Sequence, residues 1–142
     1  MGSTSYESDF YAWTQTQAAL LRTGNLEALD RENLAEEIES LGKAERRELE
    51  SRLRVIVIHL LKWQFQPALR SRSWQLTLQE QRIRLQAHLQ DNPSLKSRIL
   101  EALGRAYPLA VLGAERETGL ESFPGECPFT IEQILASDFF PQ

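Results

Sequence analysis

Apolar side chains recur with helical spacing along most of the chain, and this period is the strongest constraint on the fold. Between Asp30 and Pro67 they follow steps of three, four, seven or eight residues: Leu34, Ile38, Leu41, Leu49, Leu53, Ile56, Leu60 and Trp63. Strand-like alternation with Asn-Gly or Asp-Gly turns is missing from the sequence. The pattern predicts an all-α protein, a bundle of four main helices with a short appended C-terminal helix.

Capping residues set the expected bounds of the first two helices. Ser8 or Asp9 can cap a helix that runs to about Arg22, where Gly24 tolerates the left-handed conformation of a helix end. Asp30 can cap a second helix that runs to about Gln66. Without interruption this second helix would be ~54 Å long, more than a compact domain needs. We therefore expect a kink or break near Gly42.

Prolines and a capping box mark the remaining helices. Pro67 is suited to the first position of a third helix, which should end at about Gln90, and Asn92-Pro93 repeats this signature for a fourth. The fourth helix should bend at Pro108 and end at Thr118-Gly119. Thr130 and Gln133 match a capping box that opens a last short helix. Four phenylalanines are expected to pack this tail on the bundle: Phe123, Phe129, Phe139 and Phe140.

Length and composition favour one helical domain over residues 1–142, since 142 residues with 42% hydrophobic content suffice for one core. We expect residues 1–7 to be flexible, and residues 119–142 to form a loop and short helix on the bundle. No apolar stretch is long enough to cross a bilayer, and Met1–Ser5 lacks signal-peptide features, which predicts a cytoplasmic protein without membrane contacts. One cysteine and two histidines are too few for a Cys/His zinc site. No metal site and no cofactor are predicted.

Charge is segregated along the chain. Residues 1–50 carry 5 Lys/Arg against 11 Asp/Glu, residues 51–100 carry 9 against 2, and residues 101–142 carry 2 against 7. The net charges of the three segments are therefore −6, +7 and −5. We interpret this pattern as neighbouring helices that neutralise one another rather than as a nucleic-acid-binding face, because a dedicated binder usually has an uncompensated basic domain.

A cluster of glutamates opens the second helix. Glu36 and Glu39 should face solvent near a helix N-terminus, where negative charge is favoured. Glu37 lies at the margin of the apolar face and is expected to be partly buried with a basic partner. A functional acid is the less favoured interpretation of Glu37.

His59 interrupts an apolar run and is the best general acid or base in the chain, although such a histidine is more often a hydrogen-bonded core residue. Its spacing from Arg52 and Arg54 resembles the arginine and histidine signature of the helical ribonucleases of the HEPN superfamily. In those enzymes the pair acts on an RNA phosphodiester without metal. Regular helix geometry aligns only Arg52 with His59, so this alternative function rests on a short pattern.

Aromatic and basic side chains alternate around Pro67. Trp63 and Trp74 flank Arg70 and Arg72, a combination that can stack bases and bind phosphates, or pack as a polar corner of the core. Gln81 belongs to a core stripe on the third helix that carries polar groups, and its other members are Ser71, Trp74, Leu78, Leu85 and His88. We favour the packed polar core over a binding surface.

Several segments together resemble one bacterial, largely cyanobacterial family, the domain of unknown function family number 29. They are Asp9–Trp13, Asn33–Gly42, His59–Trp63, Arg70–Trp74, Gln81–Arg82, Glu117–Leu120 and Cys127–Thr130. The resemblance implies an all-helical bundle and supplies no activity or catalytic residue. Because no complete catalytic motif is present, we expect a non-catalytic interaction or regulatory protein with an unidentified protein partner. An RNA partner belongs only to the ribonuclease alternative, and a homodimer is compatible with the sequence.

Overall fold

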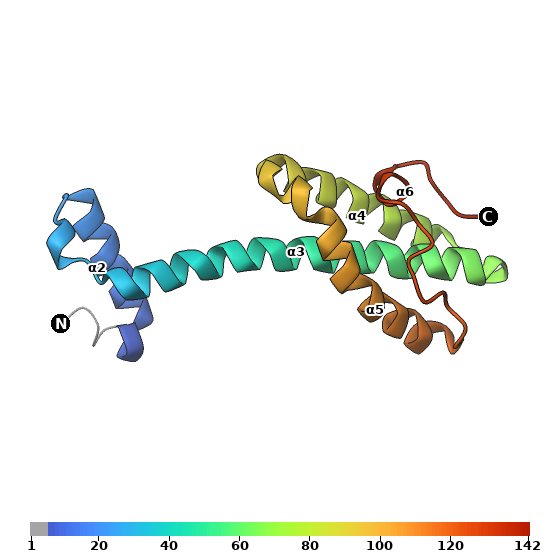
Figure 1. Ribbon diagram of the computed structural model, residues 1–142, viewed down its shortest axis with the longest axis horizontal. Helices are drawn as coiled ribbons and strands as arrows, with labels where there is room; N and C mark the ends of the chain where they lie inside the picture. Colours follow the sequence, from blue (N-terminus) through green and yellow to red (C-terminus); the bar gives the residue numbers. More distant parts are fainter. Residues whose placement is uncertain (1–5) are drawn as a thin grey trace. The chain divides into compact units, whose positions relative to one another are not determined.

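The computed structural model describes residues 6–142, and within them it contains helices and no strand. Four main helices and a short one follow in order: α2 (Phe10–Arg22), α3 (Arg31–Phe65), α4 (Arg72–Asp91), α5 (Ile99–Thr118) and α6 (Ile131–Leu135) (Figure 1). The predicted fold class is confirmed. Residues 6–8 are also helical, while residues 1–5 of the expected flexible N-terminus lie outside the described residues.

The chain divides into two compact units, Met1–Ala44 and Glu45–Gln142. The N-terminal unit holds α2, a 3₁₀ turn (Leu26–Ala28) and residues 31–44 of α3. The C-terminal unit holds the rest of α3 with α4, α5 and α6. That the whole chain unfolds as one domain stays a prediction.

Most helix ends lie where the capping residues predict them. The Asp9 side chain accepts a hydrogen bond from the Ala12 N–H, and α2 ends at Arg22 before Gly24, which has a positive φ of 76°. Thr130 and Gln133 form the predicted capping box at α6. Gly119, also at φ 76°, ends α5. Local sequence therefore sets these boundaries.

The expected break near Gly42 is wrong. α3 is a continuous α-helix of 35 residues from Arg31 to Phe65. A glycine in a helix costs only about 1 kcal/mol relative to alanine, which the hydrogen bonds of the flanking turns outweigh. The argument from length failed because it assumed that the helix had to stay within one compact body.

The third and fourth helices begin later than the prolines predict. Pro67 opens a 3₁₀ turn (Pro67–Leu69), and α4 starts at Arg72, where the Ser71 hydroxyl accepts a hydrogen bond from the Trp74 N–H. Pro93 likewise opens a 3₁₀ segment (Pro93–Arg98) that precedes α5. Each proline fits the first position of a helical turn, but that turn is 3₁₀ in both cases.

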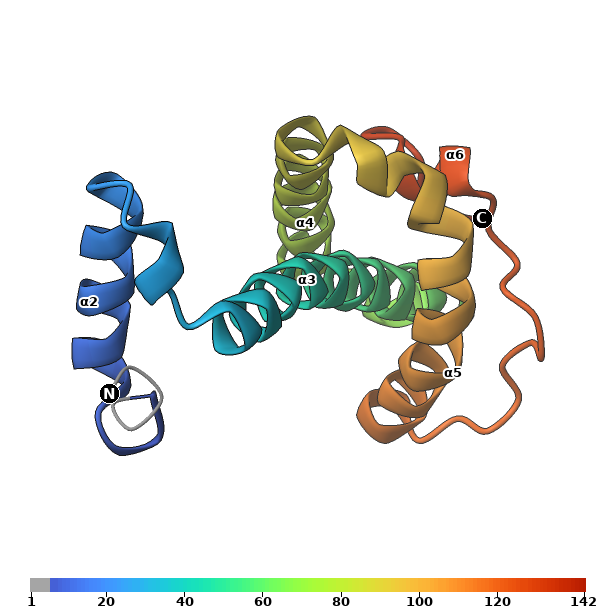
Figure 2. The same ribbon diagram turned by 60° about the vertical axis from the view of Figure 1, so that its left-hand side comes forward.

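The hydrophobic core lies in the C-terminal unit. α4 and α5 pack on the part of α3 that follows Glu45, as Figures 1 and 2 show. α5 packs tightly on α3 at Gly113, where an added Cβ would lie 2.6 Å from Ile58 Cδ1. Fully buried members of the core include Leu53, Ile56, Val57, Leu60, Leu61, Leu78, Leu85, Ala110, Ala114 and Ile134. The four phenylalanines of the tail pack against this core, as predicted. None of the helices in residues 6–142 has the length and hydropathy needed to cross a bilayer.

Candidate functional site

Arg82 of α4 anchors the C-terminal segment through backbone carbonyls. It is 2% exposed, and its guanidinium donates to the Ile134, Phe139 and Gln133 oxygens at 2.9, 3.0 and 3.1 Å. The same group lies 5.8 Å from the centre of the Phe140 ring. Burial lowers the pKa of Arg82, an effect that the nearby Asp138 carboxylate partly offsets. Each of the three guanidinium nitrogens of this buried cation thus donates to a tail carbonyl.

Arg70 and Trp63 form part of the predicted polar corner. The Arg70 Nε donates to the Trp63 backbone oxygen at 2.8 Å, and its guanidinium lies 5.1 Å from the centre of the indole ring. Another Arg70 nitrogen reaches the Gln142 oxygen at 3.1 Å, while the Trp63 ring contacts Phe140 at 4.8 Å between centres. The partners of Trp63 are therefore the tail and Arg70. These contacts support the packed-corner interpretation of both residues.

Lys62 supplies an ion pair that sequence reasoning missed. Its side chain is largely buried, and its Nζ donates to Glu117 Oε1 at 2.8 Å, which joins α3 to the end of α5. The same ammonium lies 4.7 Å from the centre of the Trp74 ring. Trp74 therefore contacts a cation from α3. Arg72, by contrast, is exposed and bonds only within its own turn, to Gln75 at 3.3 Å.

His59 is half-buried and satisfied within its own helix. Its Nδ1 lies 2.9 Å from the Val55 carbonyl oxygen, which can only accept, so Nδ1 carries the proton and donates. Burial lowers the pKa of His59. A neutral imidazole that donates to its own helix is the arrangement of a structural histidine.

The two arginines of the ribonuclease pattern are engaged elsewhere. Arg52 donates to Glu48 and to Gln81, each at 3.0 Å, and Arg54 lines a shallow hollow beside Arg105 of α5. Within the described residues neither arginine hydrogen-bonds to His59. The structure therefore brings Arg52 and Gln81 together but does not assemble the Arg/His pair.

Glu37 lies in the N-terminal unit, and its partner differs from the one expected. It accepts a hydrogen bond from the Tyr6 hydroxyl at 2.5 Å rather than pairing with a basic side chain. That bond raises the pKa of Tyr6 to about 12. The Tyr6 ring packs edge-on against Trp13, whose indole N–H donates to Asp30. The side chain of Asn33 also bonds to Asp30, and the bonds from Asn33 and Trp13 lower the pKa of the Asp30 carboxyl.

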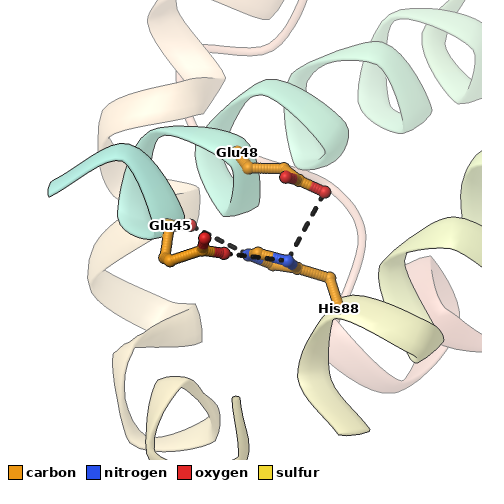
Figure 3. Close-up of side chains that lie close together, drawn as sticks. All are labelled: Glu45, Glu48 and His88. Carbon is orange, nitrogen blue, oxygen red and sulfur yellow. Dashed lines mark hydrogen bonds and ion pairs between the residues drawn. The ribbon is translucent and has the colours of Figure 1, made fainter. Parts of the chain in front are cut away.

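A cluster of three residues joins α3 to α4 in the C-terminal unit. Glu45 and Glu48 of α3 face the imidazole of His88 on α4 (Figure 3). His88 is 6% exposed, and its Nε2 lies 2.9 Å from the Glu45 backbone oxygen. Its Nδ1 lies 3.5 Å from a Glu45 carboxylate oxygen and 3.4 Å from a Glu48 carboxylate oxygen. The hollow over the cluster is also lined by Arg52, Arg84, Asp91 and Asn92.

Sequence reasoning missed this cluster, although signals for it exist. Glu45 and Glu48 are three residues apart and so share one helix face. His88 belongs to the predicted core stripe of the next helix, and it is the member of that stripe whose side chain is a common metal ligand. What the sequence lacks is the register between α3 and α4. Arg82 and Lys62 were missed for the same reason, because their partners are 51 to 57 residues away in the chain.

The fold and these contacts define a class, an all-helical protein whose buried polar side chains tie separate helices and the tail together. The chain belongs to the family described as Domain of unknown function DUF29, whose model matches residues 5–140. Comparison with curated proteins and with solved structures gives no match. The family sets the fold context and assigns no activity.

Proposed function

We propose that the chain is a cytoplasmic, non-catalytic protein-interaction module whose N-terminal unit binds a basic amphipathic helix of another protein. One observation supports this most directly. Ile38 and Leu41 belong to the apolar period that is buried at Leu49, Leu53 and later positions, yet they are 65% and 68% exposed. Exposed aliphatic side chains at helical spacing are typical of a face that a partner helix covers.

A third large apolar side chain of the N-terminal unit is exposed on α2. The hydrogen bond from Tyr6 to Glu37 joins the helical turn before α2 to this stretch of α3. Next to Tyr6, Phe10 remains 48% exposed although its ring stacks on Trp13. We call the exposed side chains of Ile38 and Leu41 the apolar patch.

Charge around the apolar patch indicates the chemistry of the partner. Residues 1–44 carry 3 Lys/Arg and 8 Asp/Glu, a net charge of −5. Glu36 and Glu39 are exposed on the same stretch of α3 as Ile38 and Leu41. A strongly acidic unit with exposed apolar side chains complements an apolar stripe flanked by lysine or arginine.

A pair of synthetic helical peptides tests this proposal against the full chain. One carries a leucine stripe flanked by lysines, and the other carries the same stripe flanked by glutamates. Fluorescence anisotropy should show tighter binding of the basic peptide, with an affinity that falls as salt rises. The double variant Ile38→Ser/Leu41→Ser should weaken binding by roughly 100-fold, since burying each side chain is worth ~1.5 kcal/mol or more.

Ile83→Ser/Leu100→Ser is the matched control, because both residues are at least as exposed but lie in the C-terminal unit. This control should bind the basic peptide as the wild type does. Equal loss in the control, or equal binding of the two peptides, would refute the proposal. Light scattering provides a second check. If the wild type is a dimer and Ile38→Ser/Leu41→Ser is a monomer, a second copy of the chain covers the apolar patch, and the proposal of a basic partner is overturned. No contact within residues 6–142 favours the ribonuclease alternative.

A further inference from the structure

We propose that Glu45, Glu48 and His88 bind a divalent transition-metal ion of the zinc type, which fastens α3 to α4. The three residues place one ligand atom each within 4.8 Å of one another. Imidazole and carboxylate are ligands of this class of ion. The ion would join residues that are separated by 40 or more positions in the sequence, all within the C-terminal unit.

The hydrogen bonding of His88 carries the argument. Its Nε2 is 2.9 Å from the Glu45 backbone oxygen, and a carbonyl oxygen can only accept, so Nε2 is the nitrogen that carries a proton. In the neutral ring Nδ1 is then the nitrogen able to bind a metal ion, and it lies 3.5 Å from a Glu45 carboxylate oxygen and 3.4 Å from a Glu48 carboxylate oxygen (Figure 3). Nδ1 and one oxygen of each carboxylate are therefore the three candidate ligand atoms, and the Arg52 guanidinium also donates to that Glu48 oxygen at 3.0 Å.

The distances from Nδ1 match those between zinc ligands. Nδ1 lies 3.4 Å and 3.5 Å from the two carboxylate oxygens, longer than the ~2.7–2.9 Å of a charge-assisted hydrogen bond. Two ligands of a tetrahedral zinc ion, each bound at ~2.0–2.1 Å, lie roughly 3.3–3.4 Å apart. The spacing of Nδ1 from each carboxylate is therefore that of two zinc ligands.

The surroundings of the cluster resemble those of protein metal sites. A metal-binding histidine usually donates its other N–H to a backbone carbonyl or carboxylate, as His88 does to Glu45. Ligating carboxylates are usually hydrogen-bonded in turn, and Arg52 donates to Glu48 at 3.0 Å while Asn92 donates to Glu45 at 3.4 Å. His88 is only 6% exposed, so its ring is fixed in place. Both glutamate side chains reach solvent, which leaves a path for the ion.

Titration calorimetry of untagged full-length protein with Zn²⁺ tests the proposal. One Zn²⁺ per chain should bind, and Mg²⁺ and Ca²⁺ should not compete at equal concentration. His88→Gln should weaken Zn²⁺ binding about 100-fold or more, because glutamine can donate to the Glu45 carbonyl but supplies no imidazole. Co²⁺ should give the intense visible absorption of a tetrahedral site, and His88→Gln should abolish it.

Glu48→Gln and Glu80→Gln form a matched pair that keeps the test decisive if His88→Gln unfolds. Glu48 contacts the cluster, whereas Glu80 lies on α4 and pairs only with the exposed Arg84. Glu48→Gln should weaken Zn²⁺ binding at least about 10-fold, and Glu80→Gln should leave it unchanged. Binding weaker than about 1 mM, or an equal loss in both variants, would overturn the proposal. So would a His88 imidazole that keeps a proton on Nδ1 in saturating Zn²⁺ by nuclear magnetic resonance.

Discussion

Arg82→Met should destabilise the protein strongly, because methionine keeps most of the apolar bulk of arginine and removes every donor. Three backbone carbonyls, of Gln133, Ile134 and Phe139, then lose their partner. Two of these carbonyls, of Ile134 and Phe139, lie on either side of the end of α6, so Arg82 holds both α6 and the chain that follows it. The expected consequence is loosening of α6 and of the chain that follows it.

The size of the effect follows from opposing contributions. A hydrogen bond to a charged donor is worth ~1.5–3 kcal/mol, so the three bonds of Arg82 contribute roughly 5–9 kcal/mol before any cost is subtracted. Dehydrating a guanidinium that is 2% exposed costs several kcal/mol, and Arg82→Met recovers that cost. We therefore expect the free energy of unfolding to fall by ~3–5 kcal/mol.

Urea melts measure the change, and Arg84→Met is the control. Arg84 lies two residues further along α4, where it is 55% exposed and pairs loosely with Glu80, so its loss should cost less than ~0.5 kcal/mol. Trp63 contacts Phe140, so its fluorescence should report release of the tail in Arg82→Met before the core unfolds. A loss below ~1 kcal/mol would refute the reasoning, since it would mean that water satisfies the three carbonyls as well as arginine does.

Three further predictions follow from the same contacts. Trp63→Ala should cost ~2–3 kcal/mol in urea melts, less than the ~3–5 kcal/mol of a fully buried tryptophan because Trp63 is half-exposed, and a loss below ~1 kcal/mol would contradict its packing on Phe140. Burial lowers the pKa of His59, so the unfolded chain binds a proton at higher pH than the folded chain. The free energy of unfolding should therefore fall as pH drops below ~6.5, and it should fall less steeply in His59→Gln. Equal slopes in the two proteins would contradict this. Gly42→Ala should raise stability by ~0.5–1 kcal/mol, since nothing lies within 4 Å of the added Cβ, and a decrease would show that α3 breaks there.

Sequence was sufficient for those parts of the fold that depend on neighbouring residues. The caps at Asp9 and Thr130 and the helix end at Gly24 involve partners three to five positions away, so their chemistry can be read along the chain. The starts of α4 and α5 were placed too early because a proline suits the first position of an α-helix and of a 3₁₀ turn equally well. The distinction depends on how the following residues pack, which the local sequence does not show.

The candidate site was harder to predict because its partners come from distant helices. The sequence predicts Gln81, Trp63 and Arg70 in a polar core, but the bonds of Gln81 to Arg52 and of Arg70 to the tail depend on how α3, α4 and the tail align. Glu45 looked like one more surface glutamate in a helix rich in them. Its role depends on His88, and the spacing of 43 residues between them has meaning only once the two helices are packed.

Arg82 and Arg70 hold the tail by its main chain, and this has a consequence for how the tail can diverge among related proteins. Every amino acid supplies a carbonyl oxygen, so side chains at Gln133 and other solvent-facing tail positions can be exchanged without loss of the anchor. The distance along the chain between the anchoring oxygens is fixed, however, by the span of one guanidinium that reaches Ile134 and Phe139 together. Exposed tail positions should therefore drift in composition, while the tail tolerates neither an insertion nor a deletion between these two carbonyls.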